Sequence, residues 1–262
     1  MRGMEMKKLT NLISVPLFLL LFFTASCETT PSGSNDSAVN SESVSASNTK
    51  PANPWPFFAS VAKENGAESE TDVLKKNYYV IFDNSGSMNE HACKGNGSKM
   101  HNAKIAMREF VKAVPQNANL GIMTFTGEKV QLGLGNQNRQ RVSAEVEAAR
   151  PETGTPLHGA IKKAYAKLTA QGRRQLSYGE YHLVIVTDGE YTDSDPAQTV
   201  NRITSESPVV VYTIGFCIGN KHSLNQPGRT EYREANDLES LRTGLKDVLA
   251  ESEKFDVSSF QK

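Results

Sequence analysis

Residues 78–88 read YYVIFDNSGSM, an apolar run that ends in one carboxylate and two hydroxyl groups. Aromatic and β-branched residues that lead into Asp-x-Ser-x-Ser predict a buried strand whose carboxyl end opens into a loop. In an open α/β sheet, ligands bind in the crevice outside the carboxyl ends of the strands. The alternate residues Asp83, Ser85 and Ser87 can turn three oxygen atoms toward one point. Because hard cations prefer oxygen ligands, this loop is a candidate metal site.

Two later stretches add oxygen donors to this loop. Residues 152–157 read ETGTPL, which predicts Thr155 as the N-cap of a helix with Pro156 at its first position. Residues 181–189 read YHLVIVTDG, a second apolar strand that delivers Asp188 into a glycine-containing turn. The expected metal-binding donors are therefore Asp83, Ser85, Ser87, Thr155 and Asp188.

Helical and strand patterns alternate along the rest of residues 76–252. Apolar residues at helical spacing predict helices over 103–114, 142–149, 156–168, 198–203 and 238–249. Apolar runs predict further strands at 120–126, 130–134, 209–216 and 230–233, the last of them at an edge. A short turn precedes residues 130–134, so this strand is expected to pair antiparallel with its predecessor. We predict an α/β fold with a Rossmann-like, doubly wound, mostly parallel sheet and one antiparallel edge hairpin.

The three motifs together resemble a von Willebrand factor type A (vWA) domain. The resemblance lies in DNSGSM at 83–88, in Thr155 of GTPL and in TDG at 187–189, and it covers roughly residues 76–252. It implies a metal-ion-dependent adhesion site that binds Mg²⁺ or Mn²⁺. By this resemblance Ser85 and Ser87 would bind the ion directly, whereas Thr155, Asp83 and Asp188 would bind it directly or through water.

The resemblance also implies a partner. The family's site leaves one coordination position for an acidic group of a protein partner, and such a module is not an enzyme. Two alternatives remain open from the residues alone. The chain could be a Mg²⁺-dependent phosphohydrolase with Asp83 as nucleophile, although Ser85 stands where a second carboxylate would be expected. The domain could also have a purely structural role with an empty site.

Charge and the N-terminus indicate where the chain acts. Lys and Arg number 29, as do Asp and Glu, so no basic excess points to nucleic acid. Residues 1–26 have the layout of a signal peptide, and Thr24-Ala25-Ser26-Cys27 resembles a bacterial lipoprotein signal with Cys27 as the lipid-modified residue. Thr24 departs from the usual Leu, and a signal cut elsewhere or an uncleaved anchor is the alternative.

The segments around the domain follow from this interpretation. Residues 27–75 would be the lipidated N-terminus, a Ser-rich tether at 28–50 and an arm from 51 whose Trp55 could pack onto the domain. Residues 253–262 would form a C-terminal tail. We expect a lipid anchor in a bacterial cell envelope, at the outer membrane or the periplasmic face.

Other polar residues near the expected site carry weaker signals. Cys93 and Cys217 follow strands that end at the same sheet edge, which allows either a disulfide or two free thiols in an oxidising compartment. Asp193 and Asp195 are interpreted as solvated loop charges. Residues 220–229 form a long irregular connection, and such connections often carry specificity.

Overall fold

The computed structural model describes residues 55–56, 71–125, 131–152 and 154–253. The predicted signal peptide, Cys27, the Ser-rich tether and the tail beyond residue 253 lie outside these residues, so they stay predictions. Among the described helices, none combines the length and the apolar character needed to cross a membrane.

The strands form one six-stranded sheet in the order β3-β2-β1-β4-β5-β6. The strands are β1 (Lys76–Phe82), β2 (Asn119–Thr124), β3 (Gln131–Gly135), β4 (Glu180–Thr187), β5 (Val209–Phe216) and β6 (Glu231–Ala235). All neighbouring pairs are parallel except β2 and β3, which are antiparallel. The predicted doubly wound sheet with one antiparallel edge hairpin is confirmed.

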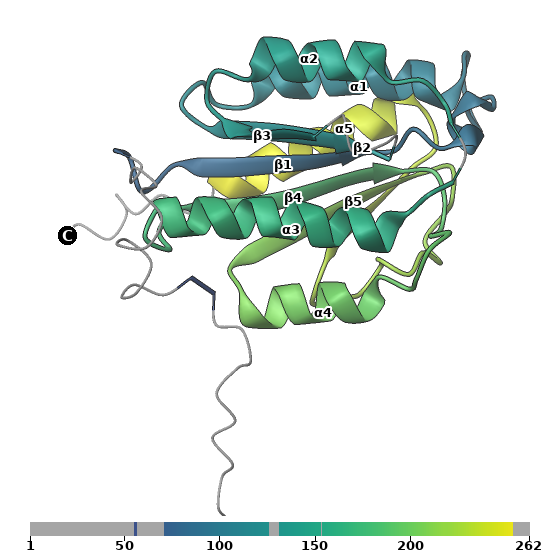
Figure 1. Ribbon diagram of the computed structural model, residues 1–262. Coiled ribbons are helices and arrows are strands. Elements are labelled where there is room, and N and C mark those ends of the chain that lie inside the picture. Colours follow the sequence, from purple (N-terminus) through teal and green to yellow (C-terminus); the bar gives the residue numbers. More distant parts are fainter. Residues whose placement is uncertain (1–54, 57–70, 126–130, 153, 254–262) are drawn as a thin grey trace, which may run out of the picture. The chain divides into compact units, whose positions relative to one another are not determined.

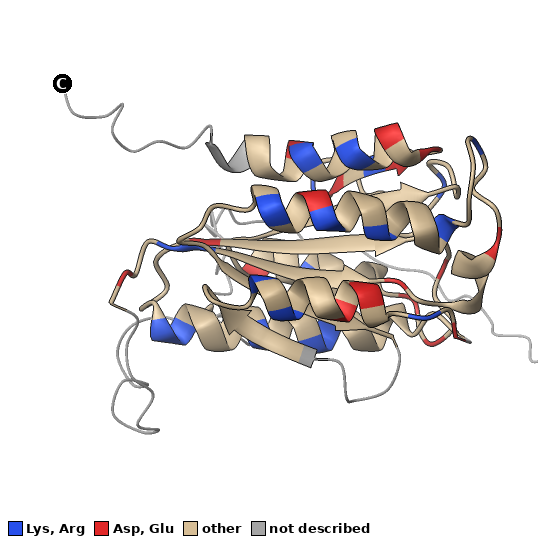
Figure 2. Ribbon diagram, turned by 90° about the horizontal axis from the view of Figure 1, so that it is seen from above, with Lys and Arg blue, Asp and Glu red and all other residues tan. Residues whose placement is uncertain are grey.

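Helices cover both faces of the sheet (Figure 1). They are the 3-10 helix η1 (Gly86–Asn89) and the helices α1 (Lys99–Ala113), α2 (Arg139–Ala148), α3 (Leu157–Arg174), α4 (Ala197–Glu206) and α5 (Leu238–Glu253). One hydrophobic core holds buried side chains of α1, α2 and α5, and the other holds those of α3 and α4. Beyond its first residue, Lys76, β1 is free of charged side chains, and Figure 2 shows charges gathered on helices and loops.

The alternation of side chains along β1 explains why this strand divides the two cores. Tyr78, Val80 and Phe82 pack in the core under α1, whereas Tyr79 and Ile81 pack in the core under α3. Successive side chains of a strand point to opposite faces, so an uninterrupted apolar run fits a strand that is buried on both sides. The apolar run of β1 therefore lies between the two hydrophobic cores.

Trp55 packs on the α3 side of the sheet. It is buried, and its ring lies 4.8 Å from that of Tyr181 and 6.3 Å from that of Tyr165. The ring fits there because Gly172 has no side chain: a Cβ on Gly172 would stand 2.5 Å from Cζ2 of Trp55. Tyr181 lies near the start of β4, so Trp55 binds at the end of the sheet opposite to the loops that follow the strands.

The strand order places a crevice at β1 and β4. The chain proceeds from β1 to β2 and β3 on one side and from β4 to β5 and β6 on the other, so the order reverses between β1 and β4. Ligands of open α/β sheets bind outside the carboxyl ends of the strands at such a switch point. The two strands that meet here are the two that Asp83 and Asp188 directly follow.

Candidate metal centre

Asp83 and Asp188 are brought together by the pairing of β1 with β4. Phe82 pairs with Val186, and the backbone N–H of Asp83 donates to the carbonyl of Val186 at 2.9 Å. Each aspartate directly follows its strand, so both carboxylates enter the same crevice. Both residues are buried, with 0% and 4% of their surface exposed.

Asp83 is held by hydrogen bonds to both carboxylate oxygens. Oδ1 accepts from the backbone N–H of Ser85 at 2.7 Å, and Oδ2 accepts from the Thr187 hydroxyl at 2.6 Å and from the Asp188 N–H at 3.4 Å. Burial raises the pKa of Asp83, and the hydrogen bonds from Ser85 and Thr187 offset only part of this rise. A buried carboxylate with a raised pKa gains from a nearby cation.

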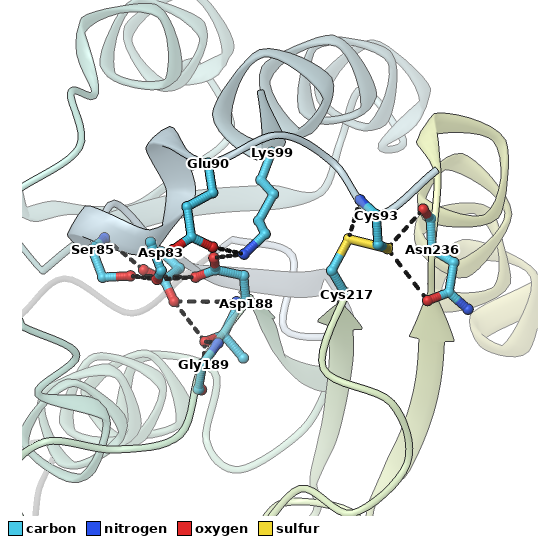
Figure 3. Close-up of polar contacts among 11 residues, drawn as sticks. Asp83, Ser85, Glu90, Cys93, Lys99, Asp188, Gly189, Cys217 and Asn236 are labelled. Atoms are coloured by element: carbon cyan, nitrogen blue, oxygen red, sulfur yellow. Dashed lines mark hydrogen bonds and ion pairs between the residues drawn. A yellow bond between two sulfur atoms is a disulfide. The ribbon is translucent and has the colours of Figure 1, made fainter. Parts of the chain in front are cut away.

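The hydroxyl groups of Ser85 and Ser87 face Asp188, and Figure 3 shows Ser85 beside Asp83 and Asp188. The Ser87 hydroxyl donates to Asp188 Oδ1 at 2.8 Å, the Ser85 hydroxyl reaches the same oxygen at 3.3 Å, and the two Oγ atoms lie 3.0 Å apart. Two hydroxyls and two carboxylates predicted from separate motifs thus lie within one network. The turn at Gly86 is close to a second loop, because a Cβ there would stand 3.0 Å from the carbonyl oxygen of Glu152.

Thr155 lies on that second loop, beside the residue after Asp188. It is buried, and its Oγ1 is 3.8 Å from the position that a Cβ on Gly189 would take. Its backbone is paired with the loop after β4: the Thr155 N–H donates to Oγ1 of Thr192 at 2.8 Å, and the Thr192 N–H donates to the Thr155 carbonyl at 2.9 Å. The structure thereby fixes Thr155 next to the Asp188 turn.

The prediction that Thr155 caps the following helix is wrong. Helix α3 begins at Leu157, after Pro156, without a side-chain cap from the residue before it. The Asp193 carboxylate, from the loop after β4, accepts instead from the N–H groups of His158 at 3.2 Å and Gly159 at 2.8 Å. A carboxylate suits the positive end of a helix dipole. Asp193 is exposed, but it binds the helix and is not merely solvated.

Lys99 enters the site from the first position of α1. Its Nζ donates to Asp188 Oδ2 at 2.9 Å and to Glu90 Oε2 at 2.8 Å (Figure 3). Burial by itself lowers the pKa of Lys99, but the hydrogen bonds and charges of Glu90 and Asp188 outweigh it and raise this pKa. The hydrogen bond and charge of Lys99 lower the pKa of Glu90. Both groups carry charge at neutral pH.

The sequence interpretation missed Lys99, although one signal could have found it. A cation in the first turn of a helix opposes the helix dipole, so a lysine there indicates a specific anionic partner. Helix α1 has no acidic residue in its first turn and begins with Lys99. The partner, Asp188, is 89 residues away along the chain, so no local sequence pattern could identify it.

A disulfide joins the metal loop to the far half of the sheet. Cys93, in the loop between β1 and α1, is bonded to Cys217, directly after β5, with their Cα atoms 5.7 Å apart. This Cα separation is usual for a disulfide. Of the two alternatives that the sequence left open, the structure has the bonded pair, and Figure 3 shows it on the other side of Lys99 from Ser85.

The connection after β5 packs against the turn that carries Asp188. His222 Nε2 bonds to the Gly189 carbonyl at 3.0 Å, and its Nδ1 accepts from the Leu224 N–H at 3.0 Å, so the proton is on Nε2. Ser223 binds Glu190 through its N–H at 3.0 Å and its hydroxyl at 2.8 Å. Residues 220–229 therefore border the candidate site, as a specificity loop must.

The donor set fits a hard divalent cation. Carboxylate and hydroxyl oxygens are the groups that Mg²⁺ and Mn²⁺ prefer. Within the part of the chain that the structure describes, no three His, Cys, Asp or Glu side chains form a cluster that could hold a metal. A cation in this crevice would therefore depend on the hydroxyls of Ser85, Ser87 and Thr155 together with the two aspartates.

Comparison with known proteins decides the family. The model of the von Willebrand factor type A domain matches residues 77–251. The chain belongs to the von Willebrand factor type A family. The vWA resemblance of the sequence motifs is thereby confirmed. A UPF0353 protein of Nocardia farcinica is 26% identical over 163 residues, which cover 58% of this chain and 48% of the relative. The chain thus spans about half the length of that relative.

Solved structures share the vWA fold at low identity. BatB from Bacteroides thetaiotaomicron is 15% identical with a TM-score of 0.55, over 68% of this chain and 99% of that chain. The pilus adhesin SpaC from Lactobacillus rhamnosus GG is 15% identical with a TM-score of 0.54, over 70% and 31%. Manganese-loaded TRAP protein of Plasmodium vivax is 16% identical with a TM-score of 0.52, over 68% and 74%. At these identities the likeness concerns the fold alone.

Proposed function

We propose that this chain is a membrane-tethered, non-enzymatic module that binds a protein partner through a divalent cation, Mg²⁺ or Mn²⁺. The observation that carries the proposal is the network of two buried carboxylates and two seryl hydroxyls at the switch point of the sheet. Asp83, Ser85, Ser87, Thr155 and Asp188 would hold the ion. When bound, the ion would supply a positive charge that accepts an oxygen ligand from outside the domain.

The composition of the site favours an acidic partner. Neutral hydroxyls leave a divalent cation less neutralised than carboxylates would, and one of the two carboxylates, Asp188, is also paired with Lys99. An incoming Asp or Glu side chain therefore gains more here than at a site built only from carboxylates. Residues 220–229, which border the Asp188 turn, would contact the partner around that acidic side chain.

The surroundings of Asp83 speak against the phosphohydrolase alternative. A nucleophilic carboxylate needs an oxygen that can approach the substrate. Asp83 is fully buried, and its oxygens accept hydrogen bonds from the Ser85 N–H and from the Thr187 hydroxyl. This arrangement suits a group that orients ligands and neutralises a cation. Incubation of the purified chain with Mg²⁺ and a phosphate monoester tests the alternative, and turnover lost in Asp83→Ala would favour it.

Relatives of the same fold are consistent with a binding role. One structural neighbour is a pilus adhesin, another is a minor pilin of Streptococcus sanguinis, and a third was solved loaded with manganese. These properties belong to those proteins and lend the proposal support by shared fold only. They fit a module whose task is to hold another protein outside the cell membrane.

We also propose that Cys27 carries the lipid anchor. As a flexible coil, residues 28–50 would span roughly 25 to 30 Å on average, enough to separate a domain from a membrane surface. Trp55 lies at the end of the sheet opposite to Asp188. Cys27→Ala is expected to release a folded protein from the membrane fraction, and continued membrane association would contradict lipidation.

Capture of partners from membrane extracts tests the binding function. The tagged full chain is used with Mn²⁺, with chelator, and with Mn²⁺ restored. We expect a partner that is retained only with the cation and lost with Ser87→Ala, which removes a hydroxyl of the network. Ser205→Ala, an exposed serine on α4, is the matched control and should retain the partner. A partner held at full strength in saturating chelator would show that it docks elsewhere.

A further inference from the structure

Lys99 places a fixed positive charge inside the candidate metal site. We propose that Lys99 is a resident counter-ion, which compensates Asp188 in the absence of metal and thereby weakens the affinity of the free domain for a cation. This inference rests on the proposed metal site and concerns how that site is regulated. Lys99 would act through Asp188, so it is a positioning and charge-setting residue and not a metal ligand.

The burial of Lys99 shows that its position is built into the fold. The residue is 8% exposed, and its ammonium bonds to one carboxylate that is fully buried and one that is exposed. A buried ammonium is costly unless it is paired and hydrogen-bonded. Because the first turn of a helix also disfavours a cation, only strong partners can account for a lysine there. Asp188 and Glu90 are those partners.

The backbone holds Lys99 in place from both sides. The Lys99 N–H donates to the Glu90 carbonyl at 2.9 Å, and His91 forms a β-bridge with Ser98, so the loop between them closes on itself. Cys93 lies in the same loop and is bonded to Cys217 beyond β5. A displacement of the Lys99 backbone would have to break these connections. Its ammonium is held separately by Glu90 and Asp188, so the positive charge lies beside the oxygens that would bind a cation.

The two oxygens of Asp188 have separate tasks. Oδ2 is bound by Lys99, and Oδ1 accepts from the hydroxyls of Ser85 and Ser87. In the absence of metal, Lys99 pairs with the buried Asp188 and orients its carboxylate. When a cation binds Asp188, Lys99 retains its second partner, Glu90, so the ammonium does not lose all compensation.

Because Lys99 adds a positive charge to the site, the affinity for a cation would depend on a further negative charge supplied by a partner. Inside the crevice Asp83 and Asp188 carry two negative charges and Lys99 removes one, whereas the third carboxylate, that of Glu90, is exposed and screened by solvent. A divalent cation would therefore exceed the charge of its buried surroundings. A partner carboxylate would restore the balance. Lys99 would thus favour release of the cation when no partner is present and retention when one has docked. Repulsion between like charges a few ångströms apart at a protein surface is large enough to change affinity by tenfold or more.

Calorimetric titration of Mn²⁺ into the metal-free full chain tests this inference. Lys99→Met keeps the apolar stem and removes the charge. We expect it to bind Mn²⁺ about tenfold more tightly than the parent or better, and to melt at a lower temperature in chelator because Asp188 loses its counter-ion. Lys99→Arg restores the charge and should bind Mn²⁺ within about threefold of the parent. Lys112→Met removes an exposed lysine from the last turn of α1 and should change nothing.

The outcomes distinguish a failure of the role proposed for Lys99 from a failure of the proposed metal site. If the parent binds Mn²⁺ and Lys99→Met binds it equally or more weakly, Lys99 does not limit affinity and the inference is overturned. If neither the parent nor the variant binds Mn²⁺, the proposed metal site fails and the inference fails with it. Lys99→Gln provides the neutral variant if Lys99→Met does not fold, with the same expectation of tighter binding.

Discussion

The contact between Trp55 and Gly172 predicts that Gly172→Ala destabilises the parent but stabilises a variant that lacks the indole ring. Trp55 is 3% exposed, and the three atoms nearest to a Cβ on Gly172 all belong to its indole ring. At 2.5 Å that Cβ would overlap the ring, so the ring would have to move. Overpacking of this kind usually costs about 1 to 3 kcal/mol. Gly172→Ala should therefore destabilise the parent.

The same substitution should stabilise a domain that lacks the indole. Trp55→Ala alone should cost about 3 to 5 kcal/mol, as for large aromatic residues in cores. In that background Gly172→Ala meets no ring, and replacing a helical glycine should then stabilise α3 by roughly 0.5 to 1 kcal/mol. The gain in helix propensity is the same in both backgrounds, so the effect of Gly172→Ala should differ between them by the cost of overpacking alone, about 1 to 3 kcal/mol.

Urea unfolding of the parent, both single variants and the double variant gives this coupling energy directly. Gly159→Ala, on the same helix, is the matched control, because its Cβ would meet Asp193 at 3.4 Å and not Trp55. Its effect should be the same with and without the indole. If Gly172→Ala stabilises the domain equally in both backgrounds, Trp55 does not pack against Gly172.

Three further predictions concern the disulfide, the helix cap and pH. Joint replacement of Cys93 and Cys217 by Ser should lower the free energy of unfolding by up to about 5 kcal/mol, because the disulfide closes a loop of 124 residues. Urea unfolding measures this loss, and an unchanged midpoint would contradict the prediction. Asp193→Ala should cost about 0.5 to 2 kcal/mol in thermal unfolding by uncapping α3, and no loss would show that the cap is dispensable. Burial raises the pKa of Asp83, so its stabilising contribution in chelator is complete below the unfolded pKa and is lost as pH rises through the higher folded pKa. Asp83→Asn should remove this pH dependence from unfolding curves, and an unaltered dependence would refute the assignment.

Local patterns in the sequence were sufficient to predict the sheet and its two aspartates. The apolar runs before Asp83 and Asp188 are long and continuous, which is typical of strands buried on both faces, and a parallel sheet brings their ends together. Such strands can be recognised from composition and spacing because both are properties of residues that are close together in the chain. The bounds of the strands and helices differ from those predicted by up to six residues, the largest difference being at the end of α3.

Contacts between distant loops could not be predicted in the same way. The cap of α3 comes from Asp193, 34 residues after Gly159, and the counter-ion of Asp188 comes from Lys99, 89 residues before it. The seat of Trp55 depends on the absence of a side chain at Gly172. Each of these contacts is fixed by how loops and helices meet across the completed sheet, so no periodicity in the sequence encodes it.

Thermal unfolding as a function of metal concentration tests the central claim most directly. A ligand that binds only the folded state stabilises it by about 2.7 kcal/mol at one hundred times its dissociation constant. The parent should melt at a progressively higher temperature as Mg²⁺ or Mn²⁺ is added, whereas Asp83→Ala should not respond. Asp237→Ala should respond like the parent, because Asp237 follows the edge strand β6 and accepts from the Ser240 N–H at the start of α5. A response of Asp83→Ala equal to that of the parent would show that the cation binds elsewhere and would contradict the proposed site.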